Sequence, residues 1–162
     1  MPRKYPERIV SGGQTGVDRG ALDAAIALGF AHGGWCPRGR LAEDGVIPAR
    51  YQLHETDSPR YSARTRQNVI DSSGTLILCW GPMQGGTDLT YRLAQQCQKP
   101  CRVVDLSVDV NAAEVRRWIQ DHQLRVLNVA GPRESSTPGI AAQTQRFLIE
   151  LLEGTGPMRR AE

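Results

Sequence analysis

Short apolar runs alternate along this chain with longer stretches of helical periodicity. The runs have the length of buried parallel strands and lie at residues 8–11, 51–55, 75–80, 102–106 and 125–130. The run from Thr75 to Trp80 is apolar on both faces, so we expect it at the centre of a sheet.

Helices are predicted between these strands, at residues 17–28, 63–71, 87–98, 112–122 and 139–152. In the first, Leu22, Ala25 and Ile26 share one face, and such a stripe can cover a sheet. Residues 30–48 fit neither period and are rich in turn formers, so we interpret them as a long functional loop. This order predicts an α/β fold with a Rossmann-like, open, mainly parallel sheet of five or more strands and helices on both faces.

Length and composition agree with one Rossmann-like domain over residues 1–162. A chain of 162 residues with 40% hydrophobic and 23% charged residues can bury its own core, and residues 154–162 are expected to form a frayed tail. No apolar run is long enough to cross a bilayer, so no membrane partner is expected. The basic N-terminus lacks a secretory signal, so we expect a cytoplasmic protein.

The cysteine content and the charge limit the kinds of site that this chain can contain. The four cysteines are too few and too irregularly spaced for a disulfide scaffold, and no C-x-x-C pair offers a metal site. The histidines lack metal-ligand or catalytic spacing, and no nucleophile elbow occurs, so we assign neither metal ligands nor catalytic residues. The net charge of +3 is dispersed, and nucleic acid is not an expected partner.

The segment from Ser11 to Gly16 joins a predicted strand directly to a helix through glycines. Glycines allow close backbone approach to a ligand, and the free amides and dipole of a helix N-terminus attract anions. The spacing matches neither G-x-G-x-x-G nor the P-loop. The alternative is a tight turn in which Thr15 or Asp18 caps the helix. The residues assigned to phosphate binding here are Gly12, Gly13, Gln14, Thr15, Gly16 and Arg19.

Two later segments also leave a strand through glycine and enter a helix. They supply Gly85, Gly86 and Thr87, and then Gly131, Arg133, Glu134 and Ser135. If their strands lie near a switch in strand order, all three turns line one crevice. Helix capping is the alternative in both places, by Thr87 or Asp88 in the first and by residues 135–137 in the second.

The long loop and the following helix add aromatic and basic groups. Trp35 offers a ring face for stacking and Arg38 offers phosphate donors, whereas Cys36 is interpreted as an inert thiol. Arg64 and Asn68 share a helix face that points either into the same crevice or into solvent.

These motifs together resemble the molybdenum cofactor carrier proteins. The similarity covers Ser-Gly-Gly-Gln-Thr-Gly-Val-Asp-Arg-Gly from Ser11, Gly-Gly-Trp-Cys-Pro-Arg-Gly-Arg from Gly33, Gly-Gly-Thr-Asp-Leu-Thr from Gly85 and Asn-Val-Ala-Gly-Pro-Arg-Glu-Ser from Asn128. That family resembles a circularly permuted branch of the Rossmannoid superfamily that includes lysine-decarboxylase-like proteins and the LOG phosphoribohydrolases. The resemblance implies a homo-oligomer, a dimer or tetramer, that binds the pterin-based molybdenum cofactor, protects it and passes it to molybdoenzymes. The phosphate is then expected at the first glycine turn and the ring system toward Trp35 and Arg133.

One departure from the LOG enzymes bears on catalysis. Their P-G-G-x-G-T-x-x-E segment ends in a glutamate that takes part in cleaving an N-glycosidic bond, and Thr90 occupies the matching position here. Asp88 and Glu134 could substitute for that glutamate. A carrier without chemistry is therefore the first hypothesis, and a nucleoside-monophosphate hydrolase or a nucleotide sensor are the alternatives.

Overall fold

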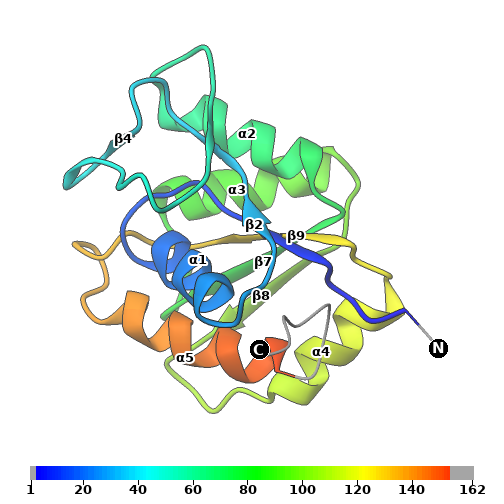
Figure 1. Cartoon of the computed structure of the whole chain (residues 1–162). Coiled ribbons are helices and arrows are strands. Elements are labelled where there is room, and N and C mark those ends of the chain that lie inside the picture. Colours follow the sequence, from blue (N-terminus) through cyan, green and yellow to red (C-terminus); the bar gives the residue numbers. More distant parts are fainter. Residues whose placement is uncertain (1–2, 154–162) are drawn as a thin grey trace.

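The computed structural model describes residues 3–153 and confirms the α/β fold (Figure 1). Five parallel strands form the central sheet, in the order β2 (His32–Gly33), β1 (Arg8–Val10), β9 (Val126–Ala130), β7 (Gly74–Cys79) and β8 (Cys101–Asp105). β7 is buried along its whole length, as its apolar sequence predicts. The frayed tail expected at residues 154–162 lies outside the described residues.

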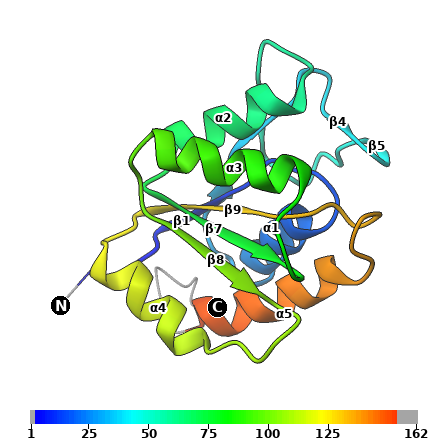
Figure 2. The same ribbon diagram turned by 180° about the vertical axis from the view of Figure 1, so that it is seen from behind.

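Helices cover both faces of the sheet (Figures 1 and 2). One face carries α1 (Val17–Ala27), α4 (Ala112–Asp121) and α5 (Ile140–Leu152), and the other carries α2 (Tyr61–Asp71) and α3 (Gly85–Gln96). The main core lies beneath the first layer, where apolar side chains such as Leu78, Val129 and Leu148 are fully buried. Within residues 3–153, no helix combines the length and apolar character needed to cross a membrane.

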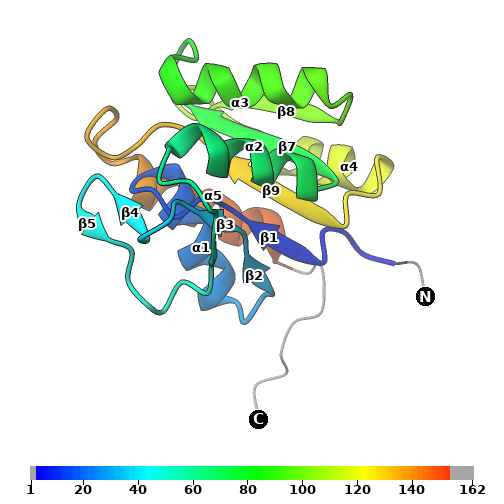
Figure 3. The same cartoon turned by 90° about the horizontal axis from the view of Figure 1, so that it is seen from above.

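The region between α1 and α2 departs from the sequence prediction (Figure 3). The strand predicted at residues 51–55 is reduced to β6 (His54–Glu55). β6 pairs with β3 (Trp35–Cys36) in a separate two-stranded ladder and does not join the central sheet. The fifth strand is β2, which comes from the segment interpreted as loop. That segment also forms a hairpin of β4 (Leu41–Ala42) and β5 (Gly45–Val46). Strands of two residues are too short to show alternation in the sequence.

The strand order reverses at the middle of the sheet. The chain moves from β1 outward to β2 on one side and from β7 outward to β8 on the other, and β9 then inserts between β1 and β7. In open α/β sheets, ligands bind where the order reverses, beyond the carboxyl ends of the strands. The carboxyl ends of β1, β9 and β7 therefore mark the expected site.

Candidate functional site

A cavity of about 470 Å³ opens at the carboxyl ends of β1, β9 and β7. Its lining comes from four stretches of chain, within residues 12–18, 61–68, 79–90 and 128–137. The volume lies in the range of small-molecule sites. The three glycine turns do meet at one crevice, as the switch in strand order predicts.

The glycines of the first turn are needed by the protein's own packing. A Cβ on Gly12 would lie 2.6 Å from the Arg64 side chain, and one on Gly16 would lie 2.3 Å from the Pro132 carbonyl oxygen. Gly13 has φ near +80° and faces Ile47 and Leu53. Close approach of a ligand is therefore not required to explain glycine at these positions.

Two polar residues predicted to hold phosphate in this turn point elsewhere. The Thr15 hydroxyl donates to Glu43, and Arg19 forms a bidentate ion pair with Asp44, with one N···O distance of 2.7 Å. Both acceptors belong to the turn of the β4–β5 hairpin. Neither Thr15 nor Arg19 lines the cavity, and carboxylates of the hairpin bind both side chains.

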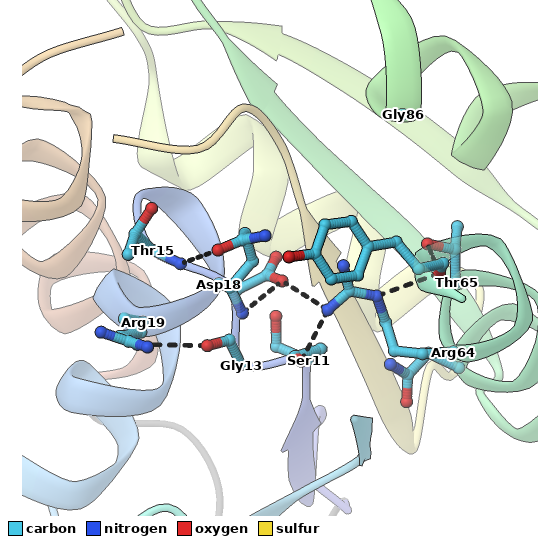
Figure 4. Close-up of polar contacts among 12 residues, drawn as sticks. Ser11, Gly13, Thr15, Asp18, Arg19, Arg64, Thr65 and Gly86 are labelled. Carbon is cyan, nitrogen blue, oxygen red and sulfur yellow. Dashed lines mark hydrogen bonds and ion pairs between the residues drawn. The ribbon is translucent and has the colours of Figure 1, made fainter. Parts of the chain in front are cut away.

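Gln14 does line the cavity, and so does Asp18, which the sequence analysis considered only as a helix cap. The Gln14 backbone N–H donates to Asp18 Oδ2 at 3.1 Å, and Gln14 Oε1 accepts from the Thr15 and Glu43 backbone N–H groups. Burial raises the pKa of Asp18, although the nearby Arg64 guanidinium acts in the opposite direction. The first turn thus presents a buried carboxyl group to the cavity (Figure 4).

Arg64 faces the cavity, which is one of the two directions that the sequence analysis considered for its helix face. It is 7% exposed, donates to the Gly12 carbonyl at 2.7 Å, and its Nη1 lies 3.8 Å from Asp18 Oδ2. Its guanidinium also lies over the Tyr61 ring, at 5.1 Å from the ring centroid. Asn68 also lines the cavity, but both ends of its amide bind the backbone of Trp35, at 2.8 and 3.0 Å.

The second glycine turn differs from the first. Gly85, Gly86 and Thr87 all line the cavity at the N-terminus of α3, and a Cβ on either glycine would meet no atom within 4 Å. Packing requires neither glycine, although the left-handed backbone of Gly85, with φ near +54°, favours glycine at that position. They leave open space in front of a helix N-terminus, where an anion is favoured.

Some residues of the third turn serve the packing of the protein, and others line the cavity. Gly131 is required by packing, since its Cβ would lie 2.1 Å from the Leu78 carbonyl oxygen. Arg133 lines the cavity with its side chain 47% exposed. Glu134 and Ser135 do not line the cavity. Glu134 accepts from the Gly139 and Ala141 backbone N–H groups at 2.6 and 3.0 Å, so it caps α5 in place of the hydroxyl residues expected there.

Trp35 and Arg38, predicted as ring and phosphate contacts, do not line the cavity. The Trp35 indole N–H donates to Asp71 at 2.7 Å. The aromatic side chains that do line the cavity are Tyr61 and Trp80, which are 37% and 40% exposed. Sequence reasoning missed both because each lies at the margin of a predicted element.

Other carboxylates and thiols offer little chemistry at the site. Asp88 pairs with Arg92, and neither Asp88 nor Glu134 lines the cavity. Cys79 lines the cavity, but burial raises the pKa of its thiol, which donates to the Gly81 carbonyl. Across residues 3–153, no three His, Cys, Asp or Glu side chains gather in a metal-binding group.

A parallel sheet whose strand order reverses beneath a polar cavity defines the class of Rossmann-like proteins that hold small ligands at the carboxyl edge. Within that class, residues 9–152 match the Circularly permutated YpsA SLOG family, and the chain belongs to this family. A similar solved structure is the "Putative molybdenum carrier protein" of Syntrophus aciditrophicus SB, which is 44% identical with a TM-score of 0.88. The alignment covers 93% of this chain and 96% of that one. A search of curated proteins found no match. The resemblance drawn from the motifs is confirmed.

Proposed function

We propose that this protein binds the molybdenum cofactor, a pterin that bears a phosphate, and stores, protects and transfers it without transforming it. Similarity to a protein named as a molybdenum carrier supports this function. The observation that carries the proposal is the open turn of Gly85 and Gly86, which packing leaves free inside a cavity of ligand size.

The phosphate is best accommodated at this second turn. Backbone amides at the start of α3 and the positive end of its dipole favour a negative group, and no side chain fills the space beside either glycine. At the first turn, the Gln14 amide already binds Asp18, whose carboxylate would repel a phosphate. We therefore assign the phosphate to the second turn instead of the first, and we expect the ring system near Tyr61 and Trp80.

Protection requires enclosure and does not require a catalytic group. Thr90 stands at the position of the LOG glutamate, and its hydroxyl is used within α3, donating to the Gly86 carbonyl at 3.0 Å. A ring held between aromatic side chains at the end of the sheet is shielded from dissolved oxidants on several sides. Transfer to molybdoenzymes would then need release of the ligand only.

The test is purification without oxygen from cells that make the cofactor. Molybdenum is measured by mass spectrometry, and the pterin is measured by its fluorescence after oxidation. We expect both in wild-type protein and their loss in Gly86→Val, which fills the open turn. Ala113→Val creates the same side chain at the exposed start of α4 by adding two carbons, and it should retain the ligand. Wild-type protein that holds a nucleotide and no molybdenum would exclude the carrier function.

A nucleotide N-glycosidase is the second candidate, favoured by the buried carboxyl of Asp18 in the cavity. A carboxyl group beside the bond could protonate a leaving base or stabilise an oxocarbenium ion. Purified protein is incubated with AMP or GMP, and the free base is quantified by chromatography. Base release that Asp18→Asn abolishes would establish this activity, and no release above the uncatalysed rate would exclude it.

A further inference from the structure

Asp18 is held firmly but incompletely satisfied at the inner end of the cavity. Its Oδ2 accepts from the Gln14 backbone N–H and faces Arg64 Nη1, which is itself fixed by the Gly12 carbonyl. Neither Gln14 nor Arg64 is bonded to its second oxygen, Oδ1, which leaves the Ser11 hydroxyl as the remaining donor beside the carboxyl group among the described residues. Ser11 lies beside the carboxyl group, but its one hydroxyl proton goes to the Val129 carbonyl at 2.6 Å.

A second unsatisfied acceptor lies on the neighbouring strand. Asn128 is 2% exposed and lines the same cavity, and its position on β9 is directly opposite Val10 of β1. Its amide nitrogen donates to the Thr75 hydroxyl at 3.3 Å, whereas its Oδ1 has no donor among residues 3–153. Within residues 3–153 the fully buried side-chain oxygen without a partner is Thr144 Oγ1, so the Asp18 and Asn128 oxygens keep access to the cavity, where the N–H groups of a ligand can bind them.

We infer that this end of the cavity selects a heterocycle with adjacent ring N–H and exocyclic amino donors, the 2-amino-4-oxopyrimidine edge shared by pterins and guanine. A carboxylate oxygen and an amide oxygen that line one cavity can accept from two neighbouring N–H donors, whereas the adenine edge alternates donor and acceptor. Asp18 is then the specificity-determining residue. The inference rests on the proposed function in that the cavity must bind a heterocycle bearing a phosphate.

The rest of the cavity agrees with this orientation. Arg64 lies over one face of the Tyr61 ring, and Tyr61 lines the same cavity as Asp18 and Arg64. A planar ligand can pack against this tyrosine ring while its N–H donors reach Asp18. In Figure 4 the open turn at Gly86 lies apart from this pair, so the phosphate and the ring edge would occupy opposite parts of the cavity.

The experiment compares 5′-GMP, 5′-IMP and 5′-AMP by isothermal titration calorimetry, because the three share the phosphate and ribose and differ in the ring edge. GMP presents the ring N–H and the amino group, IMP only the ring N–H, and AMP neither in this arrangement. We expect affinities in the order GMP, IMP, AMP, with roughly tenfold or more between GMP and AMP, the magnitude of one charge-assisted hydrogen bond.

Asp18→Asn provides the decisive variant, because it keeps the shape of the side chain and removes its charge. We expect the ratio of GMP to AMP affinity to fall toward one, which a general loss of structure would not produce. Asp23→Asn is the matched control on the same helix: Asp23 bonds the Tyr51 hydroxyl outside the cavity, and its loss should leave the ratio unchanged. Equal binding of GMP and AMP by wild-type protein, or of neither, overturns the inference. Molybdenum and pterin retained in that case would show that the carrier function stands without it.

Discussion

The carboxylate of Glu43 accepts a hydrogen bond from the Ser135 backbone N–H at 3.2 Å, across 92 positions of the chain. It also accepts from the Thr15 and Ser135 hydroxyls, and Arg133 Nη1 lies 4.0 Å away. Glu43 thereby joins the β4–β5 hairpin to the first and third glycine turns. The polar groups of these turns that seemed available to a ligand are used to hold the hairpin.

Replacing Glu43 by Gln should lower the free energy of unfolding by about 1 kcal/mol at neutral pH. Desolvation is the largest single effect on the pKa of Glu43 and raises it, but hydrogen bonds from Ser135 and Thr15 outweigh it, and the net pKa is lowered from 4.5. A lowered pKa stabilises the fold above the unfolded-state value, and this stability is lost as pH falls through the folded value. Urea unfolding of both proteins should show the difference shrinking in acid, and a difference independent of pH would contradict the assignment.

Replacing Gly86 by Ala should weaken ligand binding at little cost in stability. The new methyl group meets no protein atom, and alanine is the better helix former at the start of α3, so stability should stay level or rise by about 0.5 kcal/mol. Gly131→Ala is the contrast, since its methyl group would press on the Leu78 carbonyl and should cost at least about 2 kcal/mol. Thermal unfolding and GMP titration separate the two effects. Strong destabilisation by Gly86→Ala would show that the turn is packed.

The pH dependence of Asp18 should have the opposite sign to that of Glu43. Burial raises the folded-state pKa of Asp18 above 3.8, against the influence of Arg64, so the folded protein takes up this proton more readily than the unfolded chain. Wild-type protein should therefore gain stability relative to Asp18→Asn as pH falls through the folded pKa, with the gain complete below the unfolded value. Chemical unfolding at a series of pH values tests the sign. A wild-type advantage that declines toward acid would refute it.

Substitutions of Trp35 and Trp80 should separate an effect on stability from an effect on ligand binding. Trp35→Phe removes the indole donor to Asp71 and should cost about 1 kcal/mol of stability without affecting ligand affinity. Trp80→Ala removes a half-exposed ring that lines the cavity and should lower the affinity for the ligand. Titration with GMP and denaturant unfolding measure both quantities. Weaker binding in the Trp35 variant would return that residue to the site.

The fold was predictable because its main strands are long enough to carry a pattern. The six buried residues of β7 predicted the centre of the sheet, and the apolar stripes of α1 and α5 predicted the covering layer. β2 was not predictable, since a strand of two residues pairs through its backbone and has no period of its own. The strand predicted at residues 51–55 is present only as β6, and its pairing with β3 outside the central sheet was not predicted.

The position of the site was predictable, but its contact residues were so only in part. The glycine turns must lie at the carboxyl edge of a parallel sheet, and the cavity opens there. The direction of a long polar side chain depends on its partner, and the partners of Arg19 and Trp35 are carboxylates in distant or irregular segments. Asp18 was treated only as a helix cap, because its burial depends on Arg64 closing over it from α2.

Because β9 inserts between β1 and β7, the central sheet depends on a strand that emerges late in translation. The central strand of the sheet is the last to be synthesised, and both β1 and β7 need it as a pairing partner. A nascent chain that has emerged only to residue 125 lacks the strand that joins the two halves of the sheet and one wall of the cavity. The cavity lining is therefore complete only after translation has passed the third glycine turn, and a shorter nascent chain lacks residues 128–137 of that lining.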